Sequence, residues 1–284
     1  PGEGDVMGVW VFNGDVYAFR NKSGGATAGM FKSTATGWSE IDLGTALNFD
    51  GTVENGEPIP GDTGTPTTIV GASSGAQGDL AGITYYQDWD FGAAGTMVLT
   101  NITGTFSDNE NLQMPLLAFT SGSIEMTEGD TIVGASSGKT ATVTSVVITS
   151  GTIAAGDAAG YISVKNNSGT WTASEAININ GVDHATVNGS SQPANVAVAV
   201  ADGTQYAQTI NPGGTYEFTN YNFRGQTTGF TMYGVNTVDS GFSFDGTTFI
   251  KYKTGMETDT PEHISAHQSF LFFSYPNGSI QHSS

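Results

Sequence analysis

Short runs of β-branched and aromatic residues, separated by Gly, Asn, Asp, Ser and Thr, dominate the hydrophobic pattern of this chain. The runs at 9–12, 146–148 and 270–273 are too short for helices and have the composition of strands. Leu, Lys, Glu and Arg, which commonly cover helix surfaces, are scarce. The pattern therefore predicts an all-β fold.

Hairpin turns are the clearest local signals. Asn13-Gly14, the preferred pair for a type I′ turn, lies between two alternating apolar runs. A related turn is expected at Asp245-Gly246, and a third at 275–280. Regularly spaced hairpins, each led by an aromatic residue, are typical of the four-stranded blades of a β-propeller. We expect a propeller-like β platform.

The middle of the chain has a different composition. From 51 to 211 aromatic residues thin out, and Lys139 and Lys165 are the basic residues of a stretch that carries much of the acidic charge. Hairpin-like sequence resumes on both sides. We therefore predict a platform formed by 1–50 and 212–284, with 51–211 as an insertion.

The insertion repeats itself. The eight residues at 68–75 return unchanged at 131–138, and Gly-Thr-Phe ending at Phe106 corresponds to Gly-Thr-Trp ending at Trp171. An acidic turn follows each of these aromatic residues. We expect two small tandem β modules, with copies at about 62–115 and 125–190.

Charge and composition exclude several classes of protein. With no Cys among 284 residues, disulfide scaffolds and Cys-ligated metal sites are excluded. Eight Lys and Arg against 27 Asp and Glu give a net charge of −19, so sequence-specific nucleic-acid binding is not expected. No apolar run reaches the length of a membrane helix, and the N-terminus lacks the features of a signal peptide, so stable membrane insertion is not expected. Because the sequence begins without Met, we expect it to be part of a longer chain.

Several segments, taken in order, resemble virion structural proteins of tailed bacteriophages. They are 8–20, 30–33, 37–38, 213–218, 222–223, 232–236, 244–247, 254–256, 259–264 and 267–274. The resemblance implies a β-propeller component of the tail, similar to the nozzle of short-tailed phages. It also implies a location in the virion, a homo-oligomeric ring, contacts with other tail proteins, and a part in DNA delivery or host attachment.

The length of the platform limits this interpretation. About 120 flanking residues correspond to only about three blades of ~40 residues each. Either the propeller is incomplete within this chain, or the propeller interpretation is wrong.

Catalytic and metal-binding patterns are weak. His263 and His267 have the spacing of a helical zinc pair, but they precede a strand-like run and lack a catalytic Glu. The segment 243–249 is close to the aspartate-box turn of sialidases, yet Arg20 and Arg224 are too few for the arginine cluster of such enzymes. We therefore predict no enzymatic activity and no cofactor.

One segment of the insertion is a candidate for ligand or partner contact. It gathers four aromatic and two acidic side chains, namely Tyr85, Tyr86, Asp88, Trp89, Asp90 and Phe91. Sugars and partner proteins stack on such groups, although the same residues could fill the module's own core. On a strand, Asp88 and Asp90 would share a face. They could act as an acid–base pair or bind Ca²⁺, but the interpretation we favour is a solvated acidic surface.

This segment keeps an alternative function open. The chain could be a carbohydrate-binding or polysaccharide-degrading β protein, acting as a tail depolymerase or as an extracellular adhesin. Its partner would then be a host surface glycan or receptor.

Overall fold

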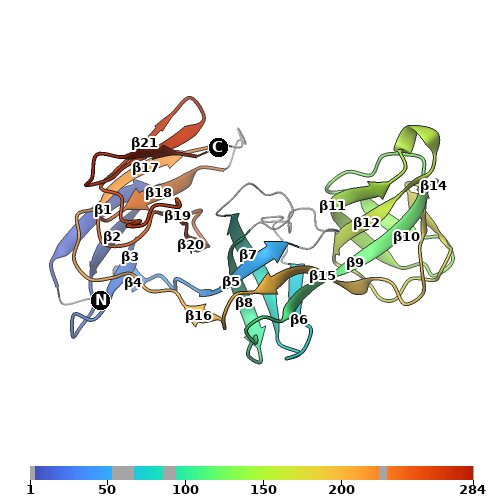
Figure 1. The fold of residues 1–284 in the computed structure, drawn as a ribbon, viewed down its shortest axis with the longest axis horizontal. Coiled ribbons are helices and arrows are strands. Elements are labelled where there is room, and N and C mark those ends of the chain that lie inside the picture. Colours follow the sequence, from blue (N-terminus) through green and yellow to red (C-terminus); the bar gives the residue numbers. More distant parts are fainter. Residues whose placement is uncertain (1–3, 53–66, 86–93, 224–228, 284) are drawn as a thin grey trace. The chain divides into compact units, whose positions relative to one another are not determined.

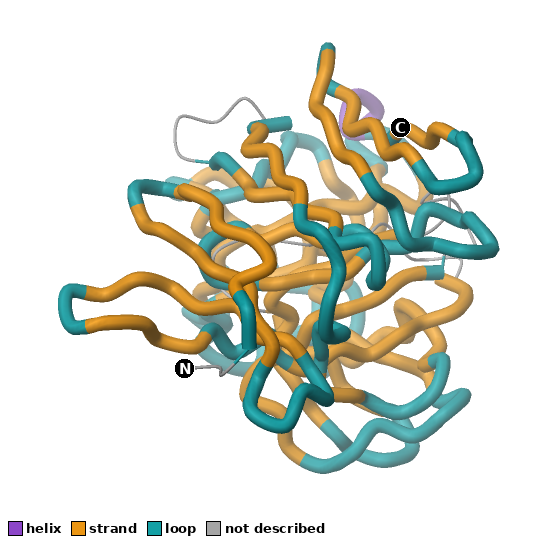
Figure 2. The backbone as a smooth tube through the Cα atoms, turned by 90° about the vertical axis from the view of Figure 1, so that its left-hand side faces the viewer, coloured by secondary structure: helices purple, strands orange, loops and turns teal. Residues whose placement is uncertain are grey.

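The computed structural model describes residues 4–52, 67–85, 94–223 and 229–283. Within these ranges the chain is strand and loop, with no α-helix and a single 3₁₀ turn, η1 (Ile153–Ala155) (Figures 1 and 2). The all-β prediction is thus confirmed.

The chain divides into two compact units. The platform unit contains 1–46, 84–86 and 206–284, and the barrel unit contains 47–83 and 87–205.

The platform unit is built from three antiparallel sheets, each of which joins strands that follow one another in the chain. Sheet 1 contains β1 (Val6–Phe12), β2 (Asp15–Asn21), β3 (Ala28–Thr34) and β4 (Gly37–Glu40). Sheet 2 contains β17 (Glu217–Tyr221), β18 (Thr231–Val235), β19 (Phe242–Phe244) and β20 (Phe249–Lys251). Sheet 3 contains β21 (His263–His267), β22 (Phe270–Ser274) and β23 (Ile280–His282).

The turns within these sheets lie where the sequence predicts them. Asn13 and Gly14 both have positive φ, of 49° and 83°, as a type I′ turn between β1 and β2 requires. The turn from β19 to β20 is longer, because Phe244 pairs with Phe249. There the Asp245 carboxylate accepts bonds from the backbone N–H groups of Thr247 and Thr248, each at 2.7 Å.

An aromatic core joins sheets 1 and 2. Ring centroids lie 5.2 Å apart for Phe19 and Phe218, and 6.1 Å apart for Phe12 and Phe244. The first strands of the two sheets are also joined by a polar side chain. Asn220 of β17 accepts a bond from the Trp10 indole at 2.8 Å and donates one to the Val11 carbonyl at 3.0 Å.

Sheet 3 packs on the opposite face of sheet 2. Along β18, Met232 belongs to the core shared with sheet 1, whereas Tyr233 and Val235 pack with residues of sheet 3 such as Leu271. The carboxylate of Glu217 in β17 accepts a bond from the backbone N–H of Ile264 in β21, at 2.9 Å. Because side chains alternate across a strand, sheet 2 lies between sheets 1 and 3.

The barrel unit consists of two rings of strands. The first ring runs β9-β15-β5-β8-β7-β6 and returns to β9, and the second runs β9-β12-β11-β10-β13-β14 and also returns to β9. Strands of the first ring are β5 (Thr45–Thr52), β6 (Thr67–Gly71), β7 (Gln77–Tyr85), β8 (Gly95–Thr103), β9 (Asn111–Gly122) and β15 (Ala194–Ala201). The second ring adds β10 (Thr131–Gly134), β11 (Thr140–Ser150), β12 (Ala158–Lys165), β13 (Ala176–Ile179) and β14 (Val182–Val187). A short strand of the platform unit, β16 (Tyr206–Ala207), pairs with Thr45 and Ala46 at the start of β5, which belong to the same unit.

Each ring has the same strand order, and the two rings share β9. The first half of β9 pairs with β6 and β15, while its second half pairs with β12 and β14. The repeated sequences occupy equivalent positions, since Gly71 pairs with Leu112 in one ring and Gly134 with Ile177 in the other.

In the order of the chain, most of the second barrel is inserted between two paired strands of the first. In the second ring, β13 and β14 are joined by a two-residue turn, Asn180-Gly181, with positive φ at both residues. The equivalent strands of the first ring are β9 and β15, and the whole second barrel stands between them in the sequence. The two repeats follow one another in the sequence, but the strands that complete the first barrel come both before and after the second.

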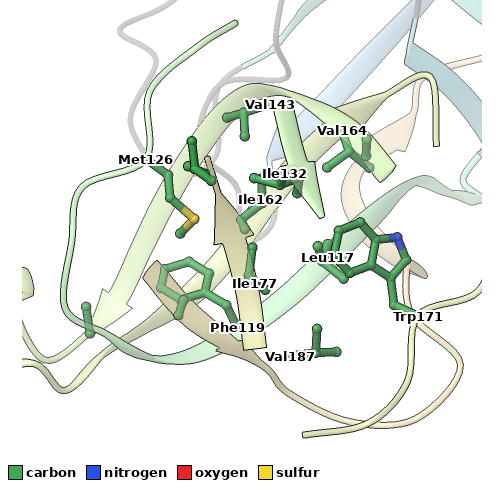
Figure 3. Packing of buried hydrophobic residues seen from close by; sticks show 14 residues of the cluster. Leu117, Phe119, Met126, Ile132, Val143, Ile162, Val164, Trp171, Ile177 and Val187 are labelled. Carbon is green, nitrogen blue, oxygen red and sulfur yellow. The ribbon is translucent and has the colours of Figure 1, made fainter. Parts of the chain in front are cut away.

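Equivalent aromatic residues fill both barrels. Phe106 and Trp171 are each almost fully buried. In the second barrel Trp171 packs with Leu117, Phe119, Ile162 and other apolar residues drawn from every strand of the ring (Figure 3). Its indole N–H donates to the Asn167 side chain at 2.8 Å, which satisfies its polar atom.

Candidate interaction surface

The aromatic segment predicted as a contact site falls mostly outside the described residues. Tyr85 is the last residue of β7 and is partly buried. The other predicted contact residues, Tyr86, Asp88, Trp89, Asp90 and Phe91, lie outside the described residues. Their role in binding stays a prediction.

Three of the four His gather on the outward face of sheet 3. His263 and His267 lie at the two ends of β21, and His282 ends β23. All three are exposed. Along β21 side chains alternate between two faces, and Ile264 faces sheet 2, so His263 and His267 face outward. The strand explains why the four-residue spacing does not form a helical zinc pair. The fourth, His184, lies in β14 with its Nδ1 3.0 Å from the Glu125 carbonyl oxygen.

No group of three or more His, Asp or Glu that could hold a metal ion is found in the described part of the chain. Among the same residues, no helix has the length and apolar character needed to cross a membrane.

Aromatic and aliphatic side chains share this outward face with the His residues. Along β22, Leu271 and Phe273 are buried against sheet 2, whereas Phe270 is 41% exposed. Ile280 of β23 is 67% exposed. The Phe270 and His282 rings meet edge to face with centroids 5.6 Å apart. We call the outward side of β21, β22 and β23 the C-face.

The C-face stands out in its charge. Residues 263–284 contain none of the 27 acidic residues and none of the eight Lys and Arg of the chain. A chain with a net charge of −19 would repel copies of itself wherever acids cover the surface. The C-face exposes large apolar groups, and the carboxylate of Glu217 in β17 lies 3.2 Å from the His263 Nδ1 atom at its edge.

Sheet 1, on the other side of sheet 2, also exposes apolar side chains on its outward side. In β1, Trp10 and Phe12 point toward sheet 2, whereas Val9 and Val11 on the other side are 54% and 58% exposed. Trp38 of β4 pairs with Ser33 across the sheet and is 43% exposed. We call the outward side of β1 to β4 the N-face. Strand pairing places Val9, Ala18, Phe31 and Glu40 in one row on this face, where Ala18 and Phe31 are buried and Glu40 forms an ion pair with Lys22.

The buried carboxylates of the barrels bind the chain itself. The Glu110 carboxylate accepts bonds from the backbone N–H groups of Ser73, Ser74 and Ser107 and from the hydroxyls of Ser73 and Ser74, at 2.6 to 3.0 Å. Burial raises the pKa of this carboxyl, but the bonds from Ser74, Ser107 and Ser73 outweigh burial and lower the pKa to about 2.

The second barrel repeats this arrangement. The Glu175 carboxylate accepts bonds from the backbone of Ser136, Ser137 and Thr172 and from the Ser137 hydroxyl, at 2.6 to 2.9 Å. Burial again raises the pKa, and these bonds lower it overall. The repeated Gly-Ala-Ser-Ser-Gly turns are thus anion-binding turns occupied by the protein's own glutamates. The repeat of both the turn and the acidic loop is visible in the sequence, but residue spacing alone does not reveal that one binds the other.

A buried carboxylate also lies in the platform. Asp239 accepts bonds from the Asn211 backbone at 2.9 Å, from the side chains of Asn211 and Asn236, and from the Lys251 ammonium at 2.5 Å. With both oxygens engaged, this carboxylate fixes the segment that returns from the barrels to the sheets of the platform.

Comparison with known proteins finds no matching family model, no matching curated protein and no matching solved structure.

Proposed function

We propose that the chain is a structural component of a bacteriophage tail, located in the virion and without catalytic activity. In this proposal the three sheets of the platform are propeller blades, the chain assembles with copies of itself and other tail proteins, and the assembly serves DNA delivery or host attachment. The resemblance of the flanking segments to tail proteins supplies the biological setting.

The stack of three meander sheets, with exposed apolar side chains on both outer sheets, is the observation that carries this proposal. Propellers have about four to eight blades, so three sheets require more sheets from elsewhere to close a ring. Large exposed apolar faces are typical of surfaces that a partner covers. A symmetric tail assembly would supply that partner.

The charge and the buried polar groups agree with a scaffold role. The described buried carboxylates Glu110, Glu175 and Asp239 are saturated by hydrogen bonds from the chain, which fixes turns and leaves no oxygen for an external substrate. A net charge of −19 keeps copies soluble and apart until specific contacts form.

The experiment is to locate the chain in virions. Antibodies raised against the purified chain are applied to purified particles of the phage that encodes it, and gold label is imaged by electron microscopy. We expect label at the tail, with capsids unlabelled. Absence of the chain from particles would overturn the proposal. If the same purified chain then bound or cleaved a glycan on an array, the carbohydrate function would replace it.

A further inference from the structure

An amine, a carboxylate and an amide meet at one buried point of the platform. Lys251 lies in β20, and its Nζ atom is 2.5 Å from Oδ1 of Asp239. The other carboxylate oxygen, Oδ2, accepts a bond from the side-chain Nδ2 of Asn236 at 2.8 Å. The Asp239 carboxylate thus bridges the lysine amine and the asparagine amide.

The amide of Asn236 is held as an acyl acceptor would be. Its Oδ1 accepts bonds from the backbone N–H groups of Asp239 and Val238, at 2.7 and 3.2 Å. When a nucleophile adds to the carbonyl carbon, negative charge develops on this oxygen, and two fixed N–H donors stabilise that charge. The same side chain donates through Nδ2 to the Tyr216 hydroxyl at 3.3 Å, which fixes the orientation of the amide.

The surroundings favour uncharged groups. Asn236 is fully buried, and the Asp239 side chain is 3% exposed, whereas that of Lys251 is 27% exposed. Burial also raises the pKa of the neighbouring Tyr216 to about 12. Low solvation penalises a charged pair, so a proton can pass from the lysine ammonium to the Asp239 carboxylate. The neutral amine that results is the nucleophilic form of lysine.

We propose that Lys251 and Asn236 condense into an isopeptide bond within the chain, with Asp239 carrying the protons. The neutral Nζ adds to Cγ of Asn236, which forms the Nζ–Cγ bond and moves the carbonyl electron pair onto Oδ1. Asp239 then gives its proton to Nδ2 and takes one from Nζ. The Cγ–Nδ2 bond breaks, and the released ammonia carries the last proton away as ammonium. One amine and one primary amide become one secondary amide, without an oxidant or a cofactor.

Asn236 is the acceptor rather than Asn211. The Asn211 side chain also donates to Oδ1 of Asp239, at 3.0 Å, but this residue is exposed to water. The flexible four-carbon stem of lysine lets Nζ move from the carboxylate to the buried amide beside it. The new bond would join β20 to the segment after β18 and would close a covalent loop around β19. The inference goes beyond the proposed tail function and does not rest on it, since it changes this chain alone.

The mass of the purified full chain tests the proposal directly. We expect the wild-type mass to be about 17 Da below that of the sequence, because one ammonia is lost. Trypsin cleaves after unmodified Lys and Arg. Because acylated Lys251 resists cleavage, digestion should give the peptide 225–253 in one piece and lighter by the same amount.

Variants assign the roles of the three residues. Lys251→Arg keeps a cation beside Asp239 but supplies no amine, so it should have the full mass of its sequence. Asp239→Asn removes the proton carrier and should also keep its ammonia. The matched control is Lys253→Arg, two positions along the chain at an exposed residue, and it should still lose about 17 Da. Circular dichroism checks folding, and Asp239→Ser replaces Asp239→Asn if that variant misfolds.

A wild-type chain with the full mass of its sequence would overturn the proposal without any variant. A crosslink between the peptides 166–224 and 225–253 would assign the bond to Asn211 instead. A loss of about 18 Da, the mass of water, would indicate condensation with a carboxylate and reject Asn236 as the acceptor. Persistence of the loss in Lys251→Arg would place the reaction elsewhere in the chain. A folded Asp239 variant that still reacts as the wild type does would reject Asp239 as the proton carrier.

Discussion

The carboxylate of Glu110 accepts hydrogen bonds from both the backbone N–H and the hydroxyl of Ser74, at 2.9 and 2.7 Å. The two residues are 36 positions apart in the chain, so these bonds join the turn to a distant segment. The second barrel forms the same bonds between Glu175 and Ser137. Each barrel thus has one buried carboxylate that joins its repeated turn to its acidic loop.

Glu110→Gln should destabilise the first barrel. The amide group retains the size of the carboxylate but presents N–H donors to the N–H groups that now bind its oxygens. We expect a loss of about 2 to 4 kcal/mol in the free energy of unfolding, measured in urea at neutral pH. Glu128→Gln is the control, because Glu128 is exposed. Equal stability of the two variants would contradict a structural role for the Glu110 carboxylate.

The same carboxylate predicts a dependence on pH. Its pKa is lowered from 4.5 to about 2 in the folded protein. The ionised carboxylate therefore contributes its full share to the free energy of unfolding above pH 4.5, and this share is lost as the pH falls through about 2. We expect the stability difference between wild type and Glu110→Gln to shrink by about 2 kcal/mol between about pH 6 and pH 3. A difference that is constant across this range would show that the pKa is not lowered.

A glycine precedes each of these turns because no side chain fits there. A Cβ atom at Gly71 would lie 2.4 Å from Ser74 Oγ and 2.5 Å from Glu110 Oε1. Gly71→Ala should therefore push the glutamate out of its turn and cost about as much as Glu110→Gln. Combining the two substitutions tests this, since the double variant should lose much less than the sum of the single losses. Additive losses in urea unfolding would contradict the shared mechanism.

The insertion of one barrel between two strands of the other predicts a place where the chain tolerates an insertion. The turn Asn180-Gly181 is equivalent to the place at which the first barrel receives the second. A small folded domain inserted there, with flexible linkers, should change the stability of the host by about 1 kcal/mol or less. The same domain inserted between Leu116 and Leu117 should prevent folding, because β9 belongs to both rings. Circular dichroism and urea unfolding compare the two, and failure of both insertions would contradict the equivalence.

In the platform, Asp239→Asn should be strongly destabilising. The substitution removes the charge that pairs with Lys251 and replaces one acceptor among the bonds from Asn211 and Asn236. We expect a loss of about 3 kcal/mol in urea unfolding. Glu257→Gln, at an exposed position of the same unit, is the control. A loss no larger than that of the control would show that Asp239 is dispensable.

Local patterns sufficed for the strands, several turns and the repeat. Alternation identified the run ending at Phe12 as a strand, and Asn13-Gly14 identified its turn, because both depend on the backbone preferences of adjacent residues. The repeated segment at 68–75 and 131–138 likewise indicated two related modules, which the structure builds as rings with the same strand order. The aromatic segment from Tyr85 to Phe91 remains a prediction, since only Tyr85 is described.

Tertiary structure decided which strands meet. The pairing of β9 with β15 joins segments that are separated in the sequence by β10 to β14, and no local preference encodes such a choice. The same holds for exposure. Phe270 and Phe273 are equally apolar in sequence, yet only one packs on sheet 2, because the sheet's orientation assigns alternate positions to its two faces. The sequence by itself thus determined strands, turns and repeats, which arise from neighbours along the chain. The insertion of one barrel between two strands of the other and the glutamate-bound turns arise from contacts between distant segments, which only the folded structure brings together.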